Sequence, residues 1–198
     1  MTNCTYFVEG LCEKQLIDSL KNTDLLIPGK VKVFNVVQAD LKPSHLLSIR
    51  DGYIVFVFDT DVSNTSYLWS NIKRVKEICP SKVRLLFLVQ VKNFEEEIVR
   101  ATDVKKPSDL TSSKSNKDFK RDFILLKDLP SVLRKHCFDI NKMWRQPVPA
   151  PFCQNISNNG AQFVVNKKKK SSIHLILSLS MLHVSLNCLE SEDIYHVK

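Results

Sequence analysis

The chain lacks several features that mark common enzyme classes. Only four of its 198 residues are glycine, and no G-x-x-x-x-G-K phosphate loop is present, so the chain shows no means of hydrolysing a nucleotide by itself. Its six cysteines include no C-x-x-C pair, which disfavours a zinc site and is typical of free thiols in a reduced cytoplasm. The five histidines show no local triad and no metal-ligand spacing. Nucleophilic catalysis is therefore not indicated.

Segments that would direct the chain to a membrane are also missing. The first ten residues contain neither a basic stretch nor a long apolar stretch, so we expect no signal peptide. The apolar residues 173–186 are too few for a membrane span, which needs about 20 residues. They follow four lysines, 167–170, which an adenine tract prone to frameshift can encode. We interpret 167–198 as a tail that is not native to the fold, with an edge strand as the alternative, and we expect a cytoplasmic protein.

What the chain has is an ordinary globular composition with an uneven charge. Apolar residues make up 43% and charged residues 25%, which suits one domain with a core of its own. The net charge is +8, of which residues 1–100 carry +1 and residues 101–198 carry +7. A polyanion such as nucleic acid could lie on the basic half. A lysine-rich surface that is merely solvated explains the charge equally well.

Apolar, β-branched runs alternate with helical patterns along the first hundred residues. Strands are expected over 3–8, 30–37, 53–58 and 82–91, and helices over 13–22, 43–49, 64–78 and 95–101. This alternation predicts βαβ units, and therefore an α/β fold with a mostly parallel four-stranded sheet flanked by helices. Beyond it we expect a polar loop over 103–122 that is either mobile or ordered by a ligand, with a helix start at 118–120 as a further option. A helix is expected over 128–137, and a proline-rich extended segment over 146–166 is expected to wrap the domain.

Acidic residues follow three of the predicted strands. Glu9 comes after the first strand, Asp59 and Asp61 come after the third, and residues 95–97, all glutamate, come after the fourth. The carboxyl ends of parallel strands meet at one edge of a sheet, where ligands bind. Carboxylates gathered there repel one another unless a divalent cation lies among them, and Mg²⁺ takes oxygen ligands of this kind. The sequence therefore predicts a site for Mg²⁺ or Mn²⁺.

Two of these segments together resemble the Toprim domain, the metal-binding catalytic fold of topoisomerases, primases and several nucleases. They are Glu9-Gly10 followed by Glu13, and Asp59-Thr60-Asp61 about fifty residues later. The form is most similar to the Toprim nucleases of bacterial defence, among them the OLD-family, RloB-like and abortive-infection proteins. Residues 93–99 are similar to the third acidic segment of the RloB-like group. The resemblance covers residues 3 to about 125 and implies a Rossmann-like, Toprim-like catalytic domain over 1–145.

The resemblance also implies roles for the amino-terminal acidic residues. Glu9 would be a metal ligand or the general acid/base of phosphoryl transfer, unless it only caps the next helix. Asp59 and Asp61 would hold Mg²⁺, because side chains two apart on an extended segment point the same way. An ordinary pair of turn aspartates is the alternative. Glu13 would support the metal ligands from behind or bind a second metal, unless it is only a glutamate that the helix dipole favours in a first turn.

For the third segment the resemblance leaves a choice of residues. Glu95 matches the family's acidic position best, with Glu97 as the alternative, whereas Glu96 is expected to be a solvated helix start. A lysine further along, Lys117 or Lys120, would neutralise the transferring phosphate. Each of these lysines has the alternative of being an ordinary solvated loop residue.

The implied function is a metal-dependent nuclease that acts on DNA or RNA as the effector of an anti-phage or abortive-infection system. An ATPase partner would supply any nucleotide hydrolysis. A topoisomerase would need a tyrosine nucleophile on a separate large domain, and a primase would need template machinery, so neither fits a chain of this length. Two alternatives stay open. One is a nucleic-acid-binding subunit without catalysis, and the other is a regulatory subunit of an ATPase whose metal site is silent.

Overall fold

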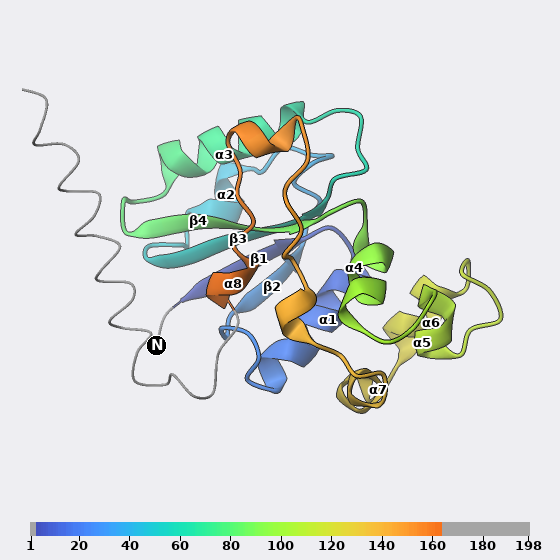
Figure 1. The fold of residues 1–198 in the computed structure, drawn as a ribbon. Helices are drawn as coiled ribbons and strands as arrows, with labels where there is room; N and C mark the ends of the chain where they lie inside the picture. Colours follow the sequence, from blue (N-terminus) through green and yellow to red (C-terminus); the bar gives the residue numbers. More distant parts are fainter. Residues whose placement is uncertain (1–2, 164–198) are drawn as a thin grey trace, which may run out of the picture. The chain divides into compact units, whose positions relative to one another are not determined.

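The computed structural model describes residues 3–163 and shows an α/β fold with one parallel sheet (Figure 1). The strands are β1 (Cys4–Val8), β2 (Lys30–Val33), β3 (Gly52–Asp59) and β4 (Val83–Gln90). They are arranged in the order β2-β1-β3-β4, and every neighbouring pair is parallel. The predicted fold class, a four-stranded parallel sheet flanked by helices, is confirmed. The interpretation of 167–198 as a tail lies outside the described residues.

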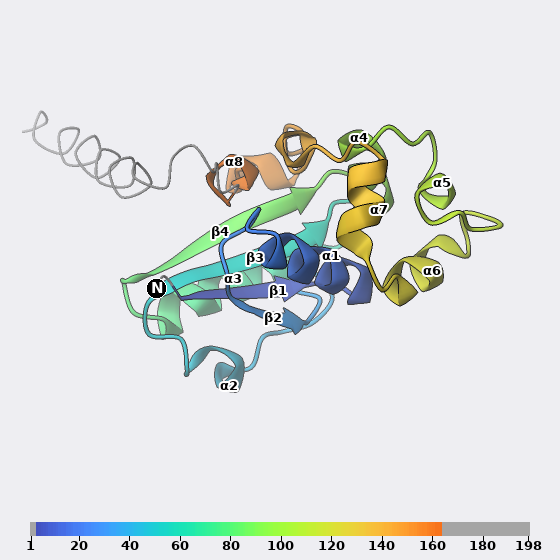
Figure 2. The ribbon, with the colours of Figure 1, turned by 90° about the horizontal axis from the view of Figure 1, so that it is seen from below.

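The helices cover both faces of the sheet, as a doubly wound topology requires (Figures 1 and 2). α1 (Leu11–Asn22) connects β1 to β2 and packs on one face together with α4 (Phe94–Ala101). α2 (Pro43–Leu46) and α3 (Ser66–Ile78) pack on the opposite face. Along the sheet, the step from β1 to β2 leads toward one edge, and the step from β3 to β4 leads toward the opposite edge.

This reversal places a topological switch point between β1 and β3. Ligands of open α/β sheets bind in the crevice outside the carboxyl ends of the strands at such a point. In Figure 2 all four strands run toward the side where α4, α5 (Pro107–Thr111) and α6 (Phe119–Leu125) lie. The topology thus predicts that a ligand would lie between the end of β1, the end of β3 and these helices.

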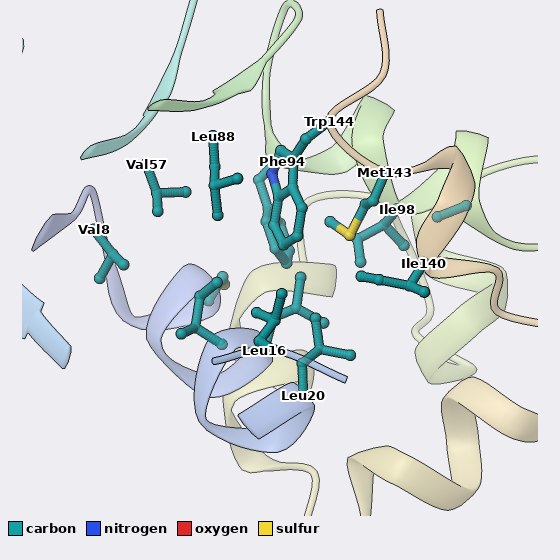
Figure 3. Packing of buried hydrophobic residues seen from close by; sticks show 14 of the residues in the cluster. Val8, Leu16, Leu20, Val57, Leu88, Phe94, Ile98, Ile140, Met143 and Trp144 are labelled. Carbon is teal, nitrogen blue, oxygen red and sulfur yellow. The ribbon is translucent and has the colours of Figure 1, made fainter. Parts of the chain in front are cut away.

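The apolar core on the α1 face explains why these elements stay together. Tyr6, Val8, Val57 and Leu88 project from the sheet and are fully buried or nearly so. Figure 3 shows how Val8, Val57 and Leu88 lie opposite α1, with Phe94 and Trp144 closing the cluster. Burial of one such side chain contributes about 1.5–3 kcal/mol, so this layer holds the carboxyl edge in place.

The segment 103–122 is not the loop that its polar composition predicts. It contains α5 and the beginning of α6, which starts where a helix start was expected. Phe119 and Phe123 are fully buried, and both aromatic rings pack on Phe94 of α4. A few apolar side chains at helical spacing therefore suffice to dock this polar segment, and its average composition conceals them.

The remaining elements complete the described part of the chain. They are α7 (Leu129–Lys135), the 3₁₀ turns Ile140–Lys142 and Phe152–Gln154, and α8 (Gly160–Phe163). Asn159 pairs with the backbone of Phe87 through two hydrogen bonds of 2.8 Å, and the Asn158 amide bonds the backbone of Val89. These contacts cover the free edge of β4, which could otherwise pair with a strand of another molecule. Within residues 3–163, no helix is long and apolar enough to cross a membrane.

Candidate functional site

Glu9 and Asp59 meet at the switch point of the sheet. Glu9 directly follows β1, and Asp59 is the last residue of β3. The backbone N–H of Asp59 donates a hydrogen bond of 3.3 Å to Oε2 of Glu9. Two acidic residues that are fifty positions apart in the chain are therefore in contact at the edge where a ligand is expected.

Asp59 is buried without a compensating partner for its charge. Its side chain is only 7% exposed, and within the described residues Oδ1 accepts no hydrogen bond. Burial and the negative charges of Glu9, Glu13 and Asp61, against the opposing charge of Lys120, together raise the pKa of this carboxyl group to about 9. A carboxylate in this position needs a cation or a proton to be stable.

Glu13 has a structural bond as well as a place in the acidic group. It lies in the first turn of α1, is 5% exposed, and accepts a hydrogen bond of 2.9 Å from the backbone N–H of Gly10. This bond satisfies one of the free amide groups at the start of the helix. Burial raises the pKa of Glu13, and the charge of Glu9 adds to this effect. Glu13 therefore both caps α1 and contributes negative charge to the crevice.

Asp61 lies on the exposed rim of the crevice, where two loops are tied together. The backbone N–H groups of Thr60 and Asp61 donate to the carbonyl of Lys92 over 2.9 Å and 3.1 Å. The side-chain amide of Asn93 donates to Oδ2 of Asp61 over 3.3 Å. Lys92 adopts a left-handed backbone with φ of 68°, which turns the chain from β4 into α4. The loop after β4 thus holds the loop that carries Asp61.

Lys120 brings a positive charge to the acidic group from α6. Its Nζ lies 3.1 Å from Oε1 of Glu95, while Oε2 of Glu95 is buried without a hydrogen-bond partner in the described part of the chain. Partial burial lowers the pKa of Lys120, but the hydrogen bond and charge of Glu95 and the charges of Asp59 and Glu13 outweigh it and raise the pKa. The thiol of Cys12 donates to the Lys120 carbonyl over 3.6 Å, which ties α6 to α1.

Lys117 is not brought to this site in the same way. It lies on the loop between α5 and α6, is exposed, and forms no ion pair with any residue of 3–163. Of the two lysines that the resemblance offers, the structure brings Lys120 to the acidic group.

Glu97 forms structural hydrogen bonds and does not join the acidic group. It is fully buried and accepts hydrogen bonds from the backbone N–H groups of Val91 and Trp144, at 3.1 Å and 3.0 Å. Its Oε1 also bonds the Arg100 guanidinium at 2.6 Å. These bonds occupy both oxygens, so Glu97 joins α4 to the segment that carries Trp144. Glu96 is half-exposed near Arg100, as expected for a solvated helix start.

Gln90 belongs to the site although the acidic pattern does not include it. It is the last residue of β4 and the register partner of Asp59. Register partners of parallel strands project from the same face of the sheet. Gln90 is fully buried, and both atoms of its amide group lack a hydrogen-bond partner among the described residues. A single glutamine within the apolar run 85–91 is a signal that sequence reasoning could have used.

The carboxylates gather at the carboxyl edge of the sheet but do not form a complete ligand set for a metal ion. Among residues 3–163, no three His, Cys, Asp or Glu side chains are gathered closely enough to hold a metal ion. Each of three carboxylates instead has one oxygen on a donor of the protein. Glu9 accepts from the Asp59 N–H and Glu13 from the Gly10 N–H, and Glu95 pairs with the Lys120 ammonium group. The buried oxygens that remain without partners suit a hard cation such as Mg²⁺ or Mn²⁺. The donor chemistry therefore fits the predicted ion, which would bind with a rearrangement of these side chains.

Comparison of the chain with protein-family models, with curated proteins and with solved structures gives no match. The resemblance to Toprim nucleases therefore stays a prediction from the motifs.

Proposed function

We propose that this chain is a metal-dependent nuclease of the Toprim type, which hydrolyses phosphodiester bonds in DNA or RNA with Mg²⁺ or Mn²⁺. The observation that carries the proposal is the contact between Glu9 and Asp59 at the switch point of the sheet. It is supported by the uncompensated burial of Asp59, because a buried carboxylate among other negative charges is stabilised by a bound cation.

The residues divide into those that hold the cation and those that handle protons and phosphate charge. Asp59, Asp61 and Glu95 would supply the oxygen ligands. Mg²⁺ held there would polarise the scissile phosphate and lower the pKa of a bound water. Glu9 is half-buried at the same edge and accepts the proton of the attacking water, a contribution of roughly 10²- to 10⁴-fold. Lys120 leaves Glu95 to neutralise charge on the transferring phosphate.

The surroundings of the site suit a polyanionic substrate. Between α4 and α7 the chain exposes several basic side chains on and beside α5 and α6. They are Lys105, Lys106, Lys114, Lys117, Lys120, Arg121 and Lys127. Basic groups beside an acidic metal site attract the nucleic-acid backbone and deliver one phosphate to the cation. On the resemblance to defence nucleases, we further propose that the chain is the effector of an anti-phage system that works with an ATPase partner.

The proposal is tested by cleavage of plasmid DNA and of tRNA by the purified full chain with Mg²⁺, with Mn²⁺ and with EDTA. Cleavage is expected with either metal and not with EDTA. Glu9→Gln and Asp59→Asn should each lower the rate by roughly 100-fold or more. Glu77→Gln is the matched control, because Glu77 is an exposed carboxylate on α3, and this variant should cleave at the normal rate. Cleavage that survives both site substitutions would show that the nuclease site is not here.

A nucleic-acid-binding subunit without catalysis is the second candidate, and the incomplete ligand set favours it. In that case gel-shift binding of DNA or RNA persists in EDTA, and no strand is cut under any metal condition. The same preparations therefore distinguish the two functions.

A further inference from the structure

A cavity of about 330 Å³ lies beside Asp61, at the loop that leads from β3 into α3. Its apolar lining comes from Val37, which is buried, and from Val62, which packs against the core on the α3 face. Tyr67, in the first turn of α3, adds an aromatic ring that is 40% exposed. The cavity thus combines an apolar lining with an aromatic side chain that the core does not use.

Polar groups with both donor and acceptor capacity complete the lining. The side-chain amide of Gln38, an exposed residue, forms no hydrogen bond with any described residue. Asn64 uses its Oδ1 to accept from the Ser66 N–H at 2.9 Å, which leaves its N–H₂ group free to donate. An aromatic ring together with two amide groups matches the chemistry of a heteroaromatic base, whose faces stack and whose edge carries donors and acceptors.

We propose that this cavity binds one nucleobase of the substrate, next to the phosphate that is processed at Glu9 and Asp59. This inference rests on the proposed nuclease function. Asp61 makes the connection, because it lines the cavity and its charge also acts on Asp59. The volume lies at the low end of the roughly 300–1,000 Å³ of small-molecule sites, so it suits a single base.

The cavity also indicates the class of substrate. A base that occupies a cavity and stacks on Tyr67 has left the stack of its own duplex, which costs least for a nucleotide that is already unpaired. The preferred substrate is therefore single-stranded nucleic acid or an RNA loop, and the scissile phosphate lies beside the unpaired base.

Binding of nucleosides to the full chain in EDTA tests this site apart from cleavage. The four ribonucleosides and their 5′-monophosphates are titrated by calorimetry, with inorganic phosphate as a separate probe. At least one nucleoside should bind saturably. Tyr67→Ala should weaken it roughly 5- to 100-fold, whereas Tyr67→Phe, which keeps the ring, should stay within about twofold. Leu125→Ala, an exposed apolar substitution on α6, is the matched control and should bind normally.

The two proposals can fail independently. No nucleoside binding, or equal binding by Tyr67→Ala and the unchanged chain, overturns the base site even if the chain cuts nucleic acid. Nucleoside binding that depends on Tyr67, in a chain that never cuts, supports the base site and contradicts the nuclease function.

The preference for unpaired substrate has its own test. In a chain that cuts, Tyr67→Ala should raise the KM for a single-stranded oligonucleotide more than for its duplex. The reverse order would contradict the preference for unpaired substrate.

Discussion

Asp59 and Gln90 are register partners at the carboxyl ends of β3 and β4, and both project from the sheet face that packs on α1. Within residues 3–163, neither Oδ1 of Asp59 nor the amide group of Gln90 has a hydrogen-bond partner. A buried polar group without a partner costs about 1–3 kcal/mol. The ends of β3 and β4 therefore carry buried polar groups that lower the stability of the fold, as sites that bind ligands commonly do.

Replacing Gln90 by leucine should separate stability from function. Gln90→Leu is expected to raise the free energy of unfolding by about 1–2 kcal/mol, because it removes an unpartnered polar group. It should also weaken Mg²⁺ binding, because an oxygen beside Asp59 is lost. Urea denaturation and metal titration measure the two effects.

Gln15→Leu is the matched control for this change. The Gln15 amide donates to the Leu126 carbonyl at 2.9 Å, so its loss should destabilise the fold and leave Mg²⁺ binding unchanged. A Gln90→Leu variant that is less stable, with normal affinity for Mg²⁺, would argue for a purely structural glutamine.

The ionisation of Asp59 should make the metal-free protein less stable as the pH rises. The folded-state pKa of about 9 lies above the ordinary value of 3.8, so the folded protein retains a proton that the unfolded chain releases. The stabilisation from this proton is complete below about pH 4 and is lost as the pH rises toward about 9. Asp59→Asn removes this dependence, so between pH 6 and pH 8 it should lose about 2–3 kcal/mol less unfolding free energy than the unchanged chain.

Urea denaturation in EDTA near pH 6 and near pH 8 measures the effect of Asp59. Asp51→Asn, at an exposed turn position before β3, provides the comparison and should follow the unchanged chain at both pH values. If Asp59→Asn and the unchanged chain lose the same stability between the two conditions, Asp59 is already ionised and compensated.

Removing the charge of Lys120 should affect catalysis and metal binding in opposite directions. Lys120→Met removes a cation that competes with Mg²⁺ for Glu95, so the affinity for Mg²⁺ should rise a few-fold. The same change should lower kcat about 10- to 100-fold, because the transferring phosphate loses a neutralising charge. Cleavage assays over a range of Mg²⁺ concentrations separate the two effects.

Lys117→Met is the matched control for Lys120, since it removes an equal charge from the same segment without breaking an ion pair within residues 3–163. Its kcat should be close to normal. Equal losses in the two variants would mean that the segment supplies only general positive charge and that Lys120 has no special position.

Glu97 and Glu96 should differ strongly in their contribution to stability. Glu97→Ala removes the acceptor of the Val91 and Trp144 N–H groups and the buried ion-pair partner of Arg100, which within residues 3–163 keeps only the Val91 carbonyl and the distant Glu96, so a loss of about 3–5 kcal/mol is expected. Glu96→Ala should change stability by no more than about 0.5 kcal/mol, since its ion pairs are long and partly exposed. Thermal and urea denaturation provide the comparison. A Glu97→Ala variant of normal stability that no longer binds Mg²⁺ would restore Glu97 as a ligand.

Much of the fold follows from local patterns in the sequence. Hydrophobic runs and helical spacing were enough to predict four parallel strands and the helices between them, because element type depends on neighbouring residues. The position of Glu9 and Asp59 after their strands is equally local. The difference over 103–122 has the opposite cause, since Phe119 and Phe123 of α6 pack on Phe94 of another helix, α4, and local composition does not record such a contact.

The sequence by itself determined that acidic side chains would leave one edge of a parallel sheet. Only the tertiary structure decided that β1 and β3 are neighbours, so that Glu9 contacts Asp59. It also decided that Lys120, and not Lys117, pairs with Glu95. Glu97 likewise bonds Arg100 and does not join the acidic group at the sheet edge. The physical reason is that strand order and side-chain direction at the ends of strands are set by packing between segments distant in the chain, whereas periodicity records only which residues are buried.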